Sequence, residues 1–229
     1  MTPARIARHL IFDFDGTLID SGPAILHTYA RILEAHGLAP AVPLTGELIG
    51  PPLPQTLARV VGRQDPLLIA QLTAEFKAHY DDEGLYATEL YPGVSEALRG
   101  LFGAGQRLYL ATNKRERPTL LLLEHFRLRE LFTAVYCLDS RTPPFADKGS
   151  MLRQLLVDQA LGTGSSVYIG DTSHDEAAAA EAGLPFVAVS WGYGVGEQRV
   201  STRARRVADL AELQVVQGKE EPQWPGQLA

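Results

Sequence analysis

The stretch Leu10-Ile11-Phe12-Asp13-Phe14-Asp15-Gly16-Thr17-Leu18 decides the fold of this chain, because it ends an apolar run with two carboxylates. Side chains alternate along a strand, so Asp13 and Asp15 are predicted to point to the same side. At about 4 Å and an effective dielectric constant of about 20, two such charges repel each other by roughly 4 kcal/mol. The pair therefore predicts a cation, a proton or both close by. Gly16 permits a sharp turn, which places the acids at the carboxyl end of the strand, where ligands bind in open α/β sheets.

Composition and charge narrow the classes of protein to consider. The chain has 229 residues, of which 45% are hydrophobic and 21% charged, and its net charge is −6. These values fit a globular protein of one or two domains, and no basic stripe indicates a nucleic-acid partner. We interpret the short cluster of Arg203, Arg205 and Arg206 as a solvated helix start. No segment is long and apolar enough for a membrane span, so we expect no membrane partner and a cytoplasmic location. The oligomeric state stays open.

Alternating patterns predict an α/β fold, in which a Rossmann-like parallel sheet carries helices on both faces. Strands are predicted at 9–14, 108–111, 134–138, 166–169 and 186–190, with helices at 94–102, 117–126, 149–160 and 176–182 between the later ones. No strand is predicted between residues 17 and 91, where the spacing of apolar residues predicts helices only. We therefore predict a core domain of residues 1–19 and 89–229, with an inserted all-helical domain of residues 20–88.

Polar residues at the ends of the next two strands suit an anionic ligand. The second strand is followed by Thr112, Asn113 and Lys114, which could hold phosphate oxygens, cap the following helix, or do both. Lys148 begins the helix after the third strand and could reach the same edge as a point charge for phosphate. An ordinary surface lysine is the alternative for Lys148, with Arg141 or Lys114 taking its place in the site.

The fourth strand ends in Gly170-Asp171-Thr172-Ser173-His174-Asp175, a GDxxxD pattern that opens an alanine-rich helix. Two carboxylates four residues apart fall on one side of such a turn and suit a hard, oxygen-binding cation. One of them could be a helix cap, but a cap does not account for both. The predicted metal site, for Mg²⁺, consists of Asp13, Asp15, Asp171 and Asp175.

Taken in order, these four stretches resemble the motifs of the haloacid dehalogenase-like (HAD) superfamily, and residues 20–88 resemble its C1-type cap. The resemblance implies that Asp13 is a nucleophile that forms an aspartyl-phosphate, and that Asp15 donates and later accepts a proton. It also implies catalytic roles for Thr112 and Lys148, which would hold the phosphoryl oxygens. Gly16, Thr17, Asn113 and Lys114 are the predicted substrate-binding residues. Mg²⁺ would be bound by Asp13, Asp171 and the main-chain carbonyl of Asp15, with Asp175 in support.

Extended similarity is closest to the phosphoglycolate phosphatase-like branch, through stretches such as Gly50-Pro51-Pro52-Leu53 and Ser190-Trp191-Gly192-Tyr193-Gly194. This resemblance implies Mg²⁺-dependent hydrolysis of a small phosphomonoester, with 2-phosphoglycolate as the first candidate and Arg59 or Lys77 of the cap as the partner for its carboxylate. An inorganic pyrophosphatase or a sugar-phosphate mutase of the same superfamily stays open. A haloalkanoate dehalogenase has no use for Asp15 or Mg²⁺. A phospho-acceptor receiver module, which is not an enzyme of this type, lacks the second acid and the cap.

Overall fold

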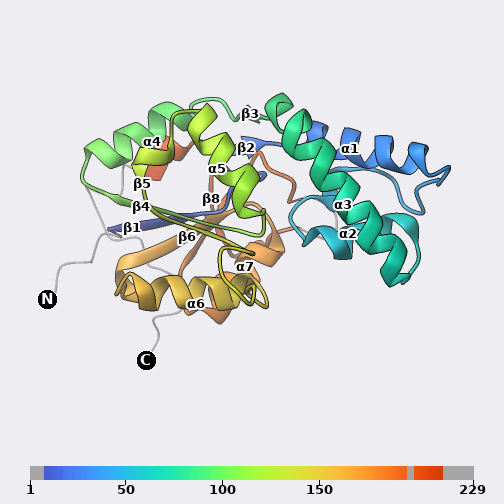
Figure 1. Cartoon of the computed structure of the whole chain (residues 1–229). Coiled ribbons are helices and arrows are strands. Elements are labelled where there is room, and N and C mark those ends of the chain that lie inside the picture. The colour runs from blue at the N-terminus through green and yellow to red at the C-terminus, as the bar shows by residue number, and fades with distance from the viewer. Residues whose placement is uncertain (1–7, 195–198, 214–229) are drawn as a thin grey trace, which may run out of the picture.

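The computed structural model describes residues 8–194 and 199–213, and a six-stranded parallel sheet runs through that part of the chain in the order β5-β4-β1-β6-β7-β8 (Figure 1). Each neighbouring pair of strands is parallel. The strands are β1 (His9–Phe12), β4 (Arg107–Thr112), β5 (Phe132–Cys137), β6 (Ser166–Gly170), β7 (Phe186–Val189) and β8 (Arg205–Val207). The predicted α/β fold with a parallel sheet is confirmed.

Helices cover both faces of the sheet, and alternate residues of β1 show why. Leu10 and Phe12 belong to the larger hydrophobic core, whereas Ile11 between them belongs to the smaller one. Figure 1 shows α4 and α5 on one face and α6 and α7 on the other. These helices are α4 (Val94–Gly103), α5 (Glu116–His125), α6 (Lys148–Asp158) and α7 (Ser173–Glu181).

The helices between β2 (Ile19–Asp20) and β3 (Glu89–Leu90) pack beside the carboxyl ends of the strands (Figure 1), and residues 20–88, the bounds predicted above, are called the cap below. The cap contains α1 (Gly22–Ala35), α2 (Leu53–Val61) and α3 (Pro66–Asp82). Local signals set these helices: prolines lie in the first turn of each, and α2 ends at Gly62 in a left-handed conformation with φ +65°. The larger core continues from the sheet into the cap through residues such as Tyr29, Leu57 and Phe76.

Two secondary-structure predictions are wrong in detail. Residues 17 to 91 do contain strands, because β2 (Ile19–Asp20) pairs with β3 (Glu89–Leu90) in an antiparallel two-stranded ladder. Arg205 and Arg206 do not start a helix but form most of β8, the edge strand beside β7. Both misses concern strands of two or three residues, which are too short to show an alternating pattern. We propose that the β2–β3 ladder marks the boundary between core and cap.

Within the described ranges, no helix has both the length and the hydropathy that a bilayer span requires.

Candidate active site

Three buried carboxylates meet at the carboxyl end of the sheet. Asp13 follows β1, Asp171 follows β6, and Asp175 lies in the first turn of α7. Each is at most 3% exposed, and each offers a carboxylate oxygen within 4.8 Å of the others. Because β1 and β6 are adjacent and parallel, motifs more than 150 residues apart in the chain are brought to one point. This cluster matches three of the four predicted metal residues.

Lys148 lies between two of these carboxylates. Its ammonium nitrogen Nζ donates to Oδ1 of Asp13 at 2.8 Å and to Oδ1 of Asp175 at 2.6 Å, and its side chain is 7% exposed. The position follows from local structure, because Asp147 and Ser150 form a capping box that starts α6 at Lys148. Burial alone would lower the pKa of Lys148, but the two carboxylates outweigh it and raise the pKa above its usual value. Lys148 therefore stays charged and points into the site.

The three carboxylates of the cluster differ in how readily they carry a negative charge. Burial raises the pKa of Asp13 to about 7, although Lys148 opposes the shift. Burial and the neighbouring Asp175 raise the pKa of Asp171 well above its usual value. Burial also acts to raise the pKa of Asp175, but Lys148 and the donors of Thr172 outweigh it, so that its pKa is lowered. Asp175 is the group that holds its negative charge most firmly.

Asp175 has hydrogen-bond donors on both oxygens. Lys148 Nζ and the hydroxyl of Tyr168 reach Oδ1, and the main-chain N–H groups of Asp171 and Thr172, together with the Thr172 hydroxyl, reach Oδ2. The Thr172 hydroxyl also accepts from the Asp175 N–H, which completes a capping box for α7. A carboxylate engaged in this way is suited to hold the cluster in place.

Asp171 is enclosed by main chain on two sides. Its Oδ2 accepts from the Tyr193 N–H at 2.6 Å, and its Oδ1 accepts from the Thr17 hydroxyl at 3.4 Å. A Cβ atom added at Gly16 would lie 2.2 Å from Asp171 Oδ2, and one added at Gly192 would lie 2.4 Å from it. Only glycine fits at these two positions, which explains why chain segments far apart can close around one carboxylate. Gly16 and Thr17, predicted to bind substrate, thus lie beside Asp171.

Asp15 has different partners from the cluster. Its Oδ1 accepts from the hydroxyl of Ser21 and from Lys114 Nζ at 2.9 Å. The same Lys114 Nζ donates to the hydroxyl of Tyr80 in the cap helix α3 at 2.8 Å. Lys114, predicted as a substrate-binding residue, is therefore held between the second carboxylate and the cap. Ser21 directly precedes α1, but its side chain makes no cap hydrogen bond to that helix.

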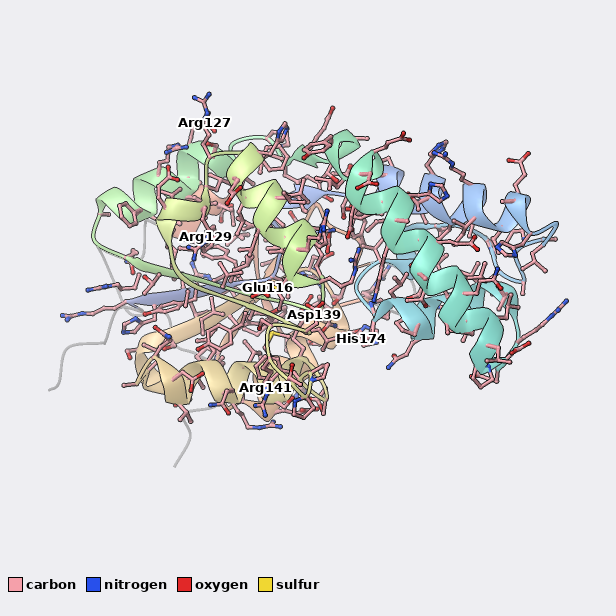
Figure 2. All side chains as sticks on the ribbon, in the orientation of Figure 1. Glu116, Arg127, Arg129, Asp139, Arg141 and His174 are labelled. Carbon is pink, nitrogen blue, oxygen red and sulfur yellow. The ribbon has the colours of Figure 1, made fainter. Side chains whose placement is uncertain are left out.

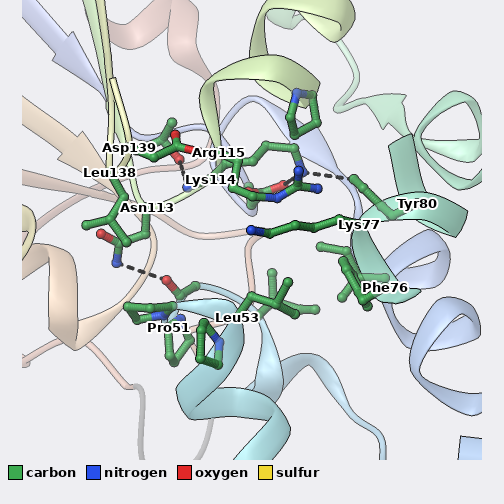
Figure 3. A pocket seen from close by; sticks show the side chains of 18 of the residues that line it. Pro51, Leu53, Phe76, Lys77, Tyr80, Asn113, Lys114, Arg115, Leu138 and Asp139 are labelled. Atoms are coloured by element: carbon green, nitrogen blue, oxygen red, sulfur yellow. Dashed lines mark hydrogen bonds and ion pairs between the residues drawn. The ribbon is translucent and has the colours of Figure 1, made fainter. Parts of the chain in front are cut away.

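A cavity of about 230 Å³ separates this edge of the sheet from the cap. Its polar end contains predicted catalytic and substrate-binding residues, and the cap side is mainly apolar, with Phe76, Leu53 and the Pro51-Pro52 segment. Figure 3 shows Lys77 extended from α3 into this space. Within the described residues Lys77 has no hydrogen bond or ion pair. The predicted residues on the cavity wall are Asp13, Asp15, Thr112, Asn113, Lys114 and Lys148.

The chain is similar in sequence to a known protein family. The family model of haloacid dehalogenase-like hydrolases matches residues 10–189, which is most of the chain. The chain belongs to the haloacid dehalogenase-like hydrolases. Membership confirms the predicted superfamily and fold class, and together with the phosphoglycolate phosphatases among the relatives it confirms the class of enzyme, a phosphatase of this superfamily. Such phosphatases use a divalent metal ion, and the buried carboxylates fit one, because they are hard oxygen ligands whose mutual repulsion a cation relieves.

Individual relatives add detail to the family assignment. A phosphoglycolate phosphatase from Cereibacter sphaeroides is 33% identical over 193 residues, which cover 80% of this chain and 85% of the relative. The tyrosine-protein kinase PtkA of Mycobacterium tuberculosis is 31% identical over 218 residues, which cover 92% of this chain and 74% of the relative. In structure, a predicted phosphatase from Clostridium acetobutylicum superposes with a TM-score of 0.81 at 24% identity, covering 92% of this chain and 97% of that one.

Two candidates from the sequence and one further residue of the GDxxxD motif lie away from the centre of this haloacid dehalogenase-like site. Arg141 is exposed and donates to the carbonyl oxygen of Pro143, so it does not replace Lys148 (Figure 2). His174 is exposed although it lies between the two acids of the GDxxxD motif. Arg59 lies 4.0 Å from Glu47 and is absent from the walls of the central cavity. Of the two cap cations, Lys77 alone lines that cavity.

Proposed function

We propose that the protein is a Mg²⁺-dependent phosphatase that hydrolyses a small phosphomonoester through a phosphorylated Asp13, with 2-phosphoglycolate as the first candidate. The observation that carries the proposal is the contact of Asp13 with Lys148 at the wall of the cavity. A buried carboxylate beside a lysine, in a pocket open to a ligand, can attack a phosphoryl group whose charge the lysine offsets.

Two displacements at phosphorus make up the proposed reaction. An Asp13 carboxylate oxygen attacks phosphorus, the bond from phosphorus to the leaving oxygen breaks, and Asp15 gives its proton to that oxygen. Asp15 then takes a proton from water, whose oxygen attacks phosphorus and releases Asp13 and inorganic phosphate. Proton transfer of this kind contributes typically 10²–10⁴-fold.

Other residues of the site hold the phosphoryl group and the metal ion. Lys148 and the Thr112 hydroxyl would contact phosphoryl oxygens, and Asn113 would support them from the next position. Asp13, Asp171 and the Asp15 main-chain carbonyl would hold Mg²⁺, with Asp175 in support. The ion would supply positive charge to the carboxylates and to the phosphoryl oxygens.

The substrate proposal rests on the charge and shape of the cavity. Lys77 is a cation without an anionic partner among the described residues, and it faces a space whose other cap residues are mainly apolar. The carboxylate of 2-phosphoglycolate would provide that partner. Pro51 and Pro52 make the adjoining wall stiff, because proline fixes φ. The relative named phosphoglycolate phosphatase supports the same choice.

The proposal is tested by measuring released phosphate, with Mg²⁺ present, for 2-phosphoglycolate, pyrophosphate, sugar phosphates and nucleotides. We expect 2-phosphoglycolate to have the highest kcat/KM. A tenfold lead for a nucleotide or hexose phosphate, which is about 1.4 kcal/mol of transition-state preference, would refute the small substrate. A lead for pyrophosphate would refute the named substrate only. Product analysis separates hydrolysis from a mutase reaction, and transfer of phosphate from ATP to a tyrosine peptide tests the activity named for PtkA.

A further inference from the structure

Three consecutive residues after β4 each contact the cap. Asn113 Nδ2 donates to the main-chain oxygen of Gly50 at 3.0 Å, and Lys114 Nζ donates to the Tyr80 hydroxyl at 2.8 Å. The Arg115 guanidinium forms two hydrogen bonds with the Asp81 carboxylate, one of them at 2.9 Å. Figure 3 shows the first two of these bonds as dashed lines across the pocket. Residues 113–115 therefore form a docking segment for the cap.

Lys114 differs from its two neighbours because it also contacts Asp15. Its ammonium nitrogen lies 2.9 Å from Asp15 Oδ1 and 4.8 Å from the centre of the Tyr80 ring, and its side chain is 6% exposed. Burial alone would lower the pKa of Lys114, but Asp15 and Tyr80 outweigh burial and raise it. A buried ammonium with three donors needs fixed acceptors. Asp15 in the core and Tyr80 in the cap are two of them.

Tyr80 is buried and packed against other aromatic rings of the cap. It is 2% exposed, and its ring stacks on Phe76 with centroids 5.4 Å apart and planes 17° apart. Phe76 in turn packs against Tyr29 of α1, with centroids 4.9 Å apart. The Tyr80 hydroxyl therefore moves only when the cap moves.

Only one oxygen of the Asp15 carboxylate accepts hydrogen bonds from the described residues. Both observed donors, Lys114 Nζ and the Ser21 hydroxyl, reach Oδ1. Ser21 is the residue immediately before α1, so it too belongs to the cap. With Oδ1 occupied, Oδ2 is the oxygen left to exchange a proton with a ligand in the cavity.

We propose that Tyr80 and Lys114 are positioning residues through which the closed cap orients Asp15 for proton transfer. This inference rests on the proposed function, because it needs Asp15 as the acid. Opening of the cap removes the Tyr80 hydroxyl from Lys114 and frees the ammonium to turn away from Asp15. The acid is then fully placed only when the cap has closed on a leaving group, and proton donation is coupled to binding.

Tyr80→Phe tests the proposal, since it keeps the ring and its stacking and removes only the acceptor oxygen. kcat/KM is compared for the best alkyl phosphomonoester, whose leaving group needs a proton, and for p-nitrophenyl phosphate, whose leaving group needs it less. We expect a loss at least fivefold larger for the alkyl substrate. Equal losses on both substrates indicate a merely structural role and overturn the proposal. Tyr86→Phe is the matched control, because Tyr86 is a cap tyrosine that is 52% exposed.

Lys114→Gln and the double variant test whether the two residues act as one unit. If Tyr80 works through Lys114, the double variant is no slower on the alkyl substrate than Lys114→Gln alone. If the activity losses of the two single variants multiply in the double variant, the link between Tyr80 and Lys114 is overturned. Absence of phosphatase activity in the wild type would refute the proposed function instead. Crystal structures of the wild type and Tyr80→Phe then decide the inference without turnover: we expect the Lys114–Asp15 contact to be lost in the variant, and an unchanged contact overturns the proposal.

Discussion

Asp13 is a carboxylate that the fold removes from water and places beside two more acids, with Lys148 as the compensating cation. Asp13→Asn keeps the shape of the side chain and removes its nucleophilic oxygen, because an amide is a poor nucleophile. We expect no measurable turnover, with circular dichroism and the melting temperature showing a folded protein. Asp158→Asn, at a surface carboxylate that accepts from Tyr136 and Gln154, is the control and should keep full activity. Activity of Asp13→Asn within a few-fold of wild type would contradict the assignment.

The raised pKa of Asp13 makes the stability of the metal-free protein depend on pH. Its folded-state pKa, about 7, lies above the ordinary value of 3.8, so its contribution to stability is fully present below 3.8 and is lost as the pH rises through about 7. In EDTA we therefore expect the melting temperature to fall further between pH 5 and pH 8 for the wild type than for Asp13→Asn. Thermal unfolding of both proteins at several pH values measures the difference. Parallel curves would show that Asp13 does not titrate in this range.

Contacts between individual elements connect core and cap. The ion pair of Arg115 and Asp81 joins the loop after β4 to the end of α3, with side chains 19% and 10% exposed. Partly buried, doubly hydrogen-bonded pairs contribute more than exposed ones. We expect Asp81→Asn to raise the opening rate of the cap by about tenfold, a change of about 1.4 kcal/mol.

Hydrogen exchange of residues 20–88 measures this opening of the cap. Glu83→Gln is the matched control, because the pair of Glu83 with Arg31 lies within the cap and is 77% and 50% exposed. Exchange that is equally fast in the two variants would show that the Arg115–Asp81 pair does not hold the cap closed.

Elements also show how far the sequence could predict this structure. Long apolar strands such as β4 and β6 can be predicted from their composition. Arg205-Arg206-Val207 has no apolar alternation, and it forms a strand only because β7 offers an open edge. Motif order favoured Lys148 but left Arg141 and Lys114 as alternatives, and only the contacts of Lys148 with two carboxylates bring it into the site. Ser21, Tyr80 and Tyr193 could not be placed from the sequence, because their roles arise from tertiary contacts. The Ser21 hydroxyl donates to Asp15 and does not cap α1. The main chain of Tyr193 holds Asp171, and its hydroxyl holds Asp20.

For the whole molecule, the acidic cluster makes metal binding a term in global stability. A ligand that binds only the folded state stabilises it by about 2.7 kcal/mol at 100 times its Kd. For a protein of this size that is a rise in Tm of about 5–10 °C. We expect Mg²⁺ to raise the Tm by this order, Asp171→Ala to abolish the rise, and excess EDTA to abolish activity. Full activity in EDTA would contradict metal dependence and would favour the dehalogenase chemistry.

The β2–β3 ladder has a consequence for how such a chain can change over generations. Ile19 pairs with Leu90 and Asp20 with Glu89, so the chain re-enters the core beside the point where it left. To the sheet, everything between is one long hairpin loop, and doubling the length of a loop costs only about 0.6 kcal/mol in closure entropy. Residues 21–88 replaced by a short Asn-Gly turn should leave a core that unfolds cooperatively in urea, and a gradual transition would show that the core depends on the cap. Insertions, deletions and exchanges at this one place leave the pairing of the core strands in place, so selection can revise what the enzyme recognises. Only the cap's own contacts to the proton-transfer group, made by Tyr80 and Ser21, tie such changes to the chemistry.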